Sequence, residues 1–176
     1  MPIGVVISKN VDDVIRIVAV SHRYGAPILA CGCDISLAGQ GSFFAGTISD
    51  EWRQAHFACM RAQDAALKVI RDGASARDAD GAARSVMQQA GFGAAFKHGL
   101  GHGFGFQAIN HAAAPVLHPA SNAVLHSGMV HNMEPAIYLE GKGGIRLNDN
   151  VAVQQDGNEV LSASLPPDLD WLVVEG

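Results

Sequence analysis

Two stretches in the middle of the chain repeat apolar residues at the spacing of an α-helix. The first begins near residues 49–51, where a serine followed by two acidic residues forms a favourable helix start. Its apolar positions are Trp52, His56 or Phe57, Cys59, Ala62, Ala66 and Ile70. The second covers residues 75–90, with Ser75 and Asp78 spaced as a capping box and Gly91 just after its end. We therefore expect two consecutive helices.

Short apolar runs separated by glycine-containing turns replace this pattern from residue 97 onward. They cover residues 129–139, 144–147, 151–154 and 159–161. Before the helices, residues 3–7, 10–22 and 27–30 read as strand, helix and strand, followed by a loop that contains glycine. The pattern predicts an α+β chain, in which a short βαβ segment precedes two helices and an antiparallel sheet.

Length and composition restrict this picture further. The 176 residues suffice for one hydrophobic core and are too few for two ordinary domains. A net charge of −5 without any cluster of lysine and arginine argues against a nucleic-acid partner. Neither a signal peptide nor a membrane-spanning run is visible, so we expect a cytoplasmic protein with no membrane partner. Cys31, Cys33 and Cys59 form no disulfide framework, and free thiols are expected.

Histidines are concentrated in one region, with six of the eight between His98 and His131. His98 and His102 have the spacing of a helical metal pair, but four glycines alternate through residues 98–105. Four glycines would cost a helix roughly 4 kcal/mol relative to alanine. We therefore predict a strand over residues 98–106, with side chains on one face and glycines on the other, so that a neighbour packs close to its backbone.

The strand geometry separates the roles of the two histidines. On an ideal strand His98 and His102 lie about 13 Å apart, so at most one of them is a direct metal ligand. Two interpretations stay open for these residues together with His111 and Glu134. They form either a catalytic or metal site, or a set of hydrogen-bonded histidines on a half-buried sheet.

Four ordered motifs carry a resemblance to a known family. They are His98-Gly-Leu-Gly-His102-Gly-Phe-Gly105, His111 with Pro115, Gly128-Met129 leading to Glu134-Pro135-Ala136-Ile137-Tyr138, and Gly144-Ile145-Arg146-Leu147-Asn148-Asp149. Together with the two preceding helices they resemble the second half of the pita-bread family of aminopeptidase P, Xaa-Pro dipeptidase, methionine aminopeptidase and creatinase. The resemblance covers residues 42–165 and implies a partial pita-bread fold, two helices plus a curved antiparallel sheet, for a domain of residues 42–176.

The same resemblance implies roles for individual residues. His102 and Glu134 correspond to metal ligands, and His98 and His111 to histidines that bind substrate and move protons. Arg146 lies in the last motif, in which Asn148 replaces the second ligating glutamate. A neutral amide binds a divalent cation less strongly than a carboxylate does.

The pair of aspartates that completes the family's metal centre cannot be located. Asp34, followed by Ile35 and Ser36, bears a weak similarity to one of them, but Arg23 stands where the earlier one would fall. Asp149 lies next to Asn148 but on a strand faces the opposite way. We therefore expect at most one weakly bound divalent ion, manganese, cobalt or zinc, and weak or absent catalysis by a metal pair.

Residues 1–41 resemble a different family. The order of residues 2–6, 11–14, 25–28 and 32–40 is similar to the start of the FAD-binding domain of glycolate oxidase and D-lactate dehydrogenase type flavoproteins. Asp34 and Ile35 replace a glycine and a threonine of the loop that holds the FAD pyrophosphate, and a carboxylate repels that group. We interpret the segment as a truncated flavoprotein start and expect no bound FAD.

Three functions follow from these interpretations. The first is a pita-bread hydrolase with an incomplete metal site, acting on a peptide as an Xaa-Pro peptidase or on a small amide as creatinase does, with its site completed across a homodimer. The second is a non-catalytic remnant or binding module of the same fold. The third is a fragment of a flavin-dependent oxidoreductase.

Overall fold

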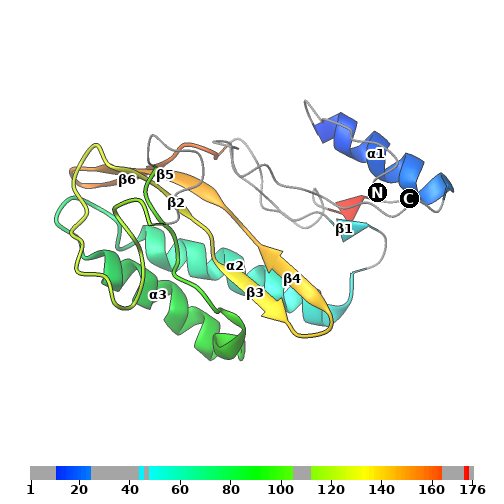
Figure 1. The fold of residues 1–176 in the computed structure, drawn as a ribbon, viewed down its shortest axis with the longest axis horizontal. Helices are drawn as coiled ribbons and strands as arrows, with labels where there is room; N and C mark the ends of the chain where they lie inside the picture. The colour runs from blue at the N-terminus through cyan, green and yellow to red at the C-terminus, as the bar shows by residue number, and fades with distance from the viewer. Residues whose placement is uncertain (1–10, 25–43, 46–47, 105–111, 164–172, 175–176) are drawn as a thin grey trace.

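The computed structural model describes residues 11–24, 44–45, 48–104, 112–163 and 173–174. Helices α2 and α3 lie side by side in one layer, and strands β2 to β6 form a second layer against them (Figure 1). This arrangement confirms the expected α+β class. The predicted helix at residues 10–22 appears as α1 (Val11–Tyr24). The strands predicted at 3–7 and 27–30 lie outside the described residues.

Helix α2 (Asp50–Leu67) begins where the sequence predicts, because Ser49 Oγ accepts a hydrogen bond from Trp52 N at 3.5 Å. It ends earlier than its apolar pattern suggests. The Asn158 side-chain amide donates to Leu67 O at 2.6 Å and to Ile70 O at 2.9 Å. A residue distant in sequence thus satisfies the free carbonyls at the C-terminal end of this helix.

Helix α3 (Ala76–Gln89) begins after Ser75, but the predicted capping box is wrong. The Ser75 side chain makes no cap hydrogen bond, and the first turn is closed by Asp78 N donating to Ser75 O at 3.0 Å. Ser75 instead pairs with Val124 in an isolated antiparallel bridge, which sets its backbone from outside the helix. Gly91 follows with φ +83°, the left-handed conformation expected beyond a helix end.

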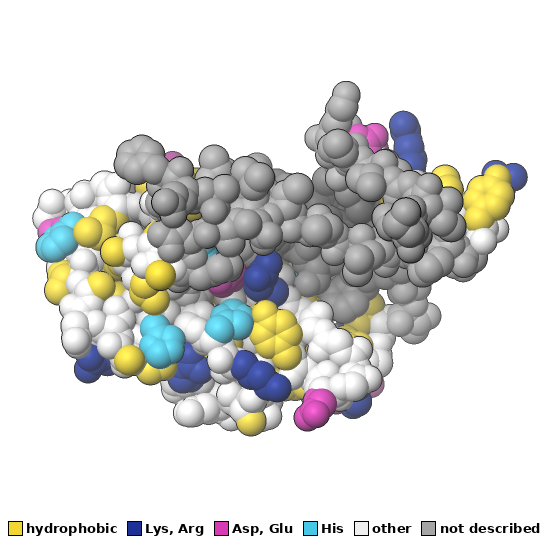
Figure 2. Space-filling view, in the orientation of Figure 1, with side chains coloured by type: hydrophobic (Ala, Val, Ile, Leu, Met, Phe, Trp, Pro, Cys, Tyr) yellow, Lys and Arg dark blue, Asp and Glu magenta, His cyan; other side chains and the backbone are white. Residues whose placement is uncertain are grey.

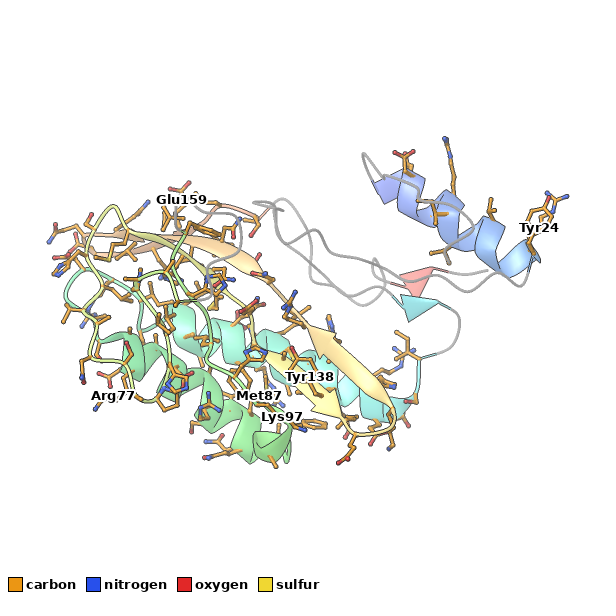
Figure 3. The ribbon with its side chains drawn as sticks, in the orientation of Figure 1. Tyr24, Arg77, Met87, Lys97, Tyr138 and Glu159 are labelled. Carbon is orange, nitrogen blue, oxygen red and sulfur yellow. The ribbon has the colours of Figure 1, made fainter. Side chains whose placement is uncertain are left out.

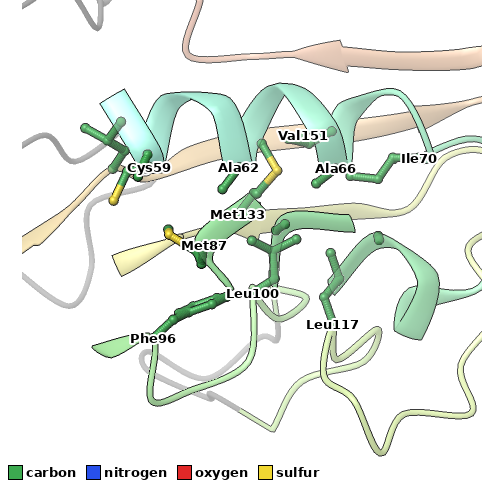
Figure 4. Packing of buried hydrophobic residues seen from close by; sticks show 14 of the residues in the cluster. Cys59, Ala62, Ala66, Ile70, Met87, Phe96, Leu100, Leu117, Met133 and Val151 are labelled. Atoms are coloured by element: carbon green, nitrogen blue, oxygen red, sulfur yellow. The ribbon is translucent and has the colours of Figure 1, made fainter. Parts of the chain in front are cut away.

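Small side chains let α2 and α3 pack closely. The fully buried alanines of the two helices are Ala55, Ala58, Ala62, Ala66, Ala76, Ala79 and Ala83. Larger residues from the sheet layer, including Met133, Val151 and Leu100, pack onto them (Figure 4). Because the sheet covers this surface, the apolar stripe predicted for the first helix becomes the core.

The described strands form three sheets, two of which are antiparallel and belong to the layer that packs on the helices. One has the order β2 (Val130–Met133), β5 (Asp149–Gln154), β6 (Gly157–Val160), and the other pairs β3 (Ala136–Leu139) with β4 (Gly143–Arg146), all antiparallel. The single run predicted at 129–139 is therefore divided at Glu134-Pro135, where proline has no N–H for a ladder. A separate parallel pair joins β1 (Phe44–Ala45) to β7 (Val173–Val174).

One register runs through the break between the two sheets. Asn132 pairs with Asn150 in the first sheet, and Ala136 pairs with Arg146 in the second. Glu134 lies two residues after Asn132 and two before Ala136, and Asn148 lies two residues before Asn150 and two after Arg146. Both pairings therefore place Glu134 opposite Asn148. Directly opposite residues of an antiparallel pair point to the same face, so these two positions share one side of the sheet layer. Among the described helices, none is both long enough and apolar enough to cross a membrane.

Candidate active site

The segment predicted as a strand at 98–106 is extended but is not a continuous strand over its described part. On one side Leu117 N donates to Gly101 O and Gly103 N donates to Ala113 O, both at 2.8 Å. Of these contacts, the one between Gly101 and Leu117 is an isolated bridge, and the described residues on this side form no regular ladder. Pairing with an irregular neighbour therefore keeps the segment extended without making it a strand.

Strand β2 and its continuation hold the other side. Asn132 N donates to His102 O at 2.9 Å, and Glu134 N donates to Leu100 O at 2.7 Å. His102 and Glu134 thus lie on neighbouring segments joined by backbone hydrogen bonds. The two positions that correspond to metal ligands in the family resemblance are therefore neighbours in the structure.

The glycines of this segment permit the close approach that their alternation predicts. A Cβ atom on Gly99 would lie 2.6 Å from Leu117 O, and one on Gly103 would overlap Ala114 O. Contacts this short do not occur for real side chains. The glycines therefore let the surrounding backbone close over the segment that carries the two histidines.

An ion pair on α3 holds the start of the segment. Asp80 is fully buried and accepts from Arg84 at 2.9 and 3.0 Å, and also from Leu100 N at 2.9 Å. Arg84 further donates to Phe96 O at 3.1 Å and to His98 O at 2.9 Å. The pair thus fixes the backbone on both sides of His98.

His102 and Glu134 form the centre of the candidate site. Their side chains are 14% and 9% exposed, and Nε2 of His102 lies 3.8 Å from Oε1 of Glu134. The nearer partner of Nε2 is the Asn132 amide nitrogen at 3.1 Å. On its other ring nitrogen, Nδ1, His102 faces Gly103 O at 2.9 Å. The two predicted ligands thus face each other. Asn132, which was not predicted for the site, contacts both the backbone N and the ring of His102.

Arg146 and Asn148 complete this face of the sheet. Nη1 of Arg146 lies 3.4 Å from Oε2 of Glu134, so the carboxylate already faces a cation of the protein. The Asn148 Oδ1 atom is buried and has no hydrogen-bond partner among the described residues. Asp149 accepts from Gln63 of α2 at 3.0 Å and from Ser162, which places it on the helix side as expected.

His98 has a separate partner on β3. Its Nε2 lies 3.0 Å from the Tyr138 hydroxyl, and its Nδ1 lies 2.7 Å from Gly99 O (Figure 3 labels Tyr138). A carbonyl only accepts, so Nδ1 carries the proton and Nε2 accepts from Tyr138. Burial raises the pKa of Tyr138, while the charge of Arg146 opposes this shift. The phenol stays protonated at neutral pH and remains a donor.

Two buried groups near the site have displaced pKa values. His131 on β2 is fully buried, and burial lowers its pKa while a backbone hydrogen bond to Asn132 O opposes the shift. Burial also raises the pKa of Cys59 to about 12. That thiol is free and neutral, so it is no nucleophile.

The sequence missed two residues of this face that motif spacing could have supplied. Asn132 precedes Glu134 by two positions on one strand, and Tyr138 ends the same motif, so alternation places them near the predicted ligands. His111 lies outside the described residues, and its role stays a prediction.

On the face in Figure 2, histidine side chains lie beside apolar and cationic ones.

Comparisons with known proteins supply the family of this α+β scaffold. The model of metallopeptidase family M24 matches residues 40–155, so the chain belongs to that family. The fold is accordingly a partial pita-bread fold, as predicted.

Individual relatives agree with this assignment. An uncharacterized peptidase of Staphylococcus aureus (strain MRSA252) is 36% identical over 66% of this chain and 32% of its own length. The Xaa-Pro dipeptidase from Bacillus anthracis superposes with a TM-score of 0.67 at 33% identity, over 73% of this chain and 35% of that one. Dipeptidase PepE from Mycobacterium ulcerans gives 0.69 at 33%, over 76% and 34%. The chain thus spans about a third of the relatives it matches.

The described residues do not fit the metal pair implied by the family. No group of three or more His, Cys, Asp or Glu side chains in the described part of the chain is arranged to hold an ion. Glu134 faces Arg146, and the position opposite it is the amide of Asn148. Asp34 lies outside the described residues.

Proposed function

We propose that this chain carries a hydrolase-like site for a small peptide or amide substrate, with weak or absent turnover. The observation that supports it is the convergence of His102, Glu134 and Arg146 on one face of the sheet layer. His98 and Tyr138 form a second pair on the adjoining strand. Peptidase and dipeptidase relatives of the same family make an Xaa-Pro dipeptide the first substrate to test.

Each residue has a role that its contacts allow. The half-exposed guanidinium of Arg146 can donate to a substrate carbonyl or carboxylate while it balances the charge of Glu134. The carboxylate of Glu134 can accept from a substrate N–H or from water. The Tyr138 hydroxyl and His98 offer a donor and acceptor joined by one hydrogen bond, the arrangement required to move a proton near a reacting amide.

The test compares cleavage of Xaa-Pro dipeptides, with and without manganese or cobalt, by the native chain and by His102→Ala. We expect rates far below the order of 10 per second that is ordinary for enzymes, and loss of the residual rate in the variant. His126→Ala, a change at an exposed histidine that lies beside Asp72, serves as control and keeps the native rate. A native rate of ordinary size that His102→Ala abolishes would show that a partner chain supplies the missing ligands.

A second candidate, a binding module without turnover, is favoured by Asn148 and by the Arg146–Glu134 contact, since both reduce the negative charge of the site. Isothermal titration with the same dipeptides separates the two functions. Binding that His102→Ala weakens, without any product, supports the module. Absence of both binding and cleavage in the native chain contradicts both proposals.

A further inference from the structure

Asn132 holds His102 at two points. Its Oδ1 accepts from the His102 backbone N at 2.7 Å, and its Nδ2 lies 3.1 Å from His102 Nε2. Because a backbone N–H only donates, it fixes which end of the amide is oxygen, and the NH₂ end must face the ring. Asn132 is 5% exposed, so water competes little for either contact.

The contacts of the ring determine its tautomer. Nδ1 of His102 lies 2.9 Å from Gly103 O, a group that only accepts, so Nδ1 carries the proton. The lone pair is then on Nε2, where it accepts from the Asn132 NH₂ group. In a metal site the same lone pair would ligate the ion, and a hydrogen bond on Nδ1 would orient the ring for it. In this structure the Asn132 amide, and not an ion, faces the Nε2 lone pair of His102.

The carboxylate of Glu134 also faces a group of the protein, the Arg146 guanidinium. Its Oε2 faces Arg146 at 3.4 Å, and its Oε1 lies 3.8 Å from the His102 ring, beyond hydrogen-bond length. A divalent cation placed between His102 and Glu134 would have to displace the Asn132 amide and lie close to a guanidinium of like charge.

We propose that Asn132 determines the metal specificity of this site by closing it to divalent cations. The amide nitrogen takes the His102 lone pair, and Arg146 takes the charge of Glu134, so the site is built as a hydrogen-bonded cluster of the protein's own groups. This inference rests on the proposed position of the active site but not on turnover, because it concerns the occupancy of His102 Nε2.

One substitution should open the site. Asn132→Asp keeps the acceptor for the His102 backbone and replaces the blocking NH₂ by a carboxylate oxygen. Two ligand atoms each about 2.0–2.1 Å from a tetrahedral zinc ion are roughly 3.3 Å apart. The observed distances from His102 Nε2, 3.1 Å to Asn132 and 3.8 Å to Glu134, bracket that value. The variant therefore places two carboxylates at ligand-like distances from His102 Nε2.

Titration of the metal-free full chain with zinc chloride, followed calorimetrically, tests the proposal. We expect Asn132→Asp to bind one zinc ion at this site at least about tenfold more tightly than the native chain, a change of the size that partners of a ligand control. Adding His102→Ala to that variant should remove the gain. Asn122→Asp introduces the same charge at an exposed position, and its isotherm should match the native one. Equal affinity of the native chain and Asn132→Asp would overturn the proposal.

A measurement on the native chain covers the case in which Asn132→Asp does not fold, as judged by circular dichroism. Nitrogen-15 spectra identify the His102 ring by its absence in His102→Gln. One equivalent of zinc should leave the Nε2 resonance of His102 unchanged, whereas a shift of that resonance to a metal-bound value contradicts the inference. Neither readout depends on hydrolysis, so an inactive protein still gives an answer.

Discussion

At the residue scale, Arg84 connects helix α3 to the backbone that carries His98. It faces the fully buried Asp80 and donates to two carbonyls of the segment that follows the helix. Its guanidinium also lies 4.4 Å from the centre of the Phe96 ring, a cation–π contact. A residue of α3 thus fixes the backbone of one of the site's histidines.

Removing this side chain should destabilise the protein strongly. Arg84→Ala leaves the Asp80 carboxylate buried without its cation, which costs about 3–5 kcal/mol in comparable pairs. We expect a loss of about 3 kcal/mol in the free energy of unfolding, measured by urea titration with circular dichroism. Arg77→Ala, on the exposed side of the same helix, should cost at most about 1 kcal/mol. Equal losses for the two variants would contradict this role of Arg84.

His131 gives stability a pH dependence of known sign. Burial lowers the pKa of the folded imidazole below its ordinary value of about 6.5, so the unfolded chain binds the proton first as pH falls. The contribution of this residue to stability is therefore present above pH 6.5 and declines below it.

The variant His131→Leu should lose less stability than the native chain between pH 7.5 and 5.5. The measurement is the free energy of unfolding of both proteins at the two pH values. Met133→Leu, a change without a titrating group on the same strand, should lower stability by the same amount at both. Parallel pH dependences for the native chain and His131→Leu would refute the effect.

At the element scale, glycine content determines whether the segment from Gly99 to Gly103 can lie between its two neighbours. Alanine at Gly103 would bring its Cβ into the Ala114 carbonyl, and backbone cannot move aside as a flexible side chain can. We expect Gly103→Ala to cost at least about 2 kcal/mol of unfolding free energy.

Gly81 supplies the matched control. It is exposed on α3, and a Cβ atom there would meet nothing within 4 Å. Gly81→Ala should therefore stabilise the protein by roughly 0.5–1 kcal/mol, through the helix preference of alanine. Thermal denaturation of both variants checks the pair. Similar melting temperatures for the two would show that the close approach at Gly103 is not maintained in solution.

At the scale of the whole molecule, the family region occupies residues 40–155 and leaves the first part of the chain outside it. In that first part the structure describes helix α1, and the loop similar to an FAD phosphate loop lies outside the described residues. The proposal that this region holds no flavin rests on the side chains of Asp34 and Ile35.

Purified protein, incubated with excess FAD and passed through gel filtration, should retain no flavin absorbance near 450 nm. A carboxylate next to the pyrophosphate would oppose binding. The double variant Asp34→Gly with Ile35→Thr restores the residue types of a flavoprotein loop and shows whether those two side chains are the obstacle. Retention of about one FAD per native chain would reverse this interpretation and support the flavin function.

Much of the architecture could be predicted from local pattern. The start of α2 at Ser49, the end of α3 before Gly91 and the order of the hairpins all depend on residues within a few positions of each other. Helical and strand periodicities are set by such neighbours.

Tertiary structure alone decided what those residues contact. Asn132 clamps His102 across thirty positions of sequence, and Asn158 caps α2 across about ninety. A sequence pattern reports which face a side chain takes, but hydrogen bonds between distant segments depend on how the layers pack. The sequence by itself therefore determined the family and most of the helices and strands, and packing decided that the lone pair of His102 faces an amide of the protein.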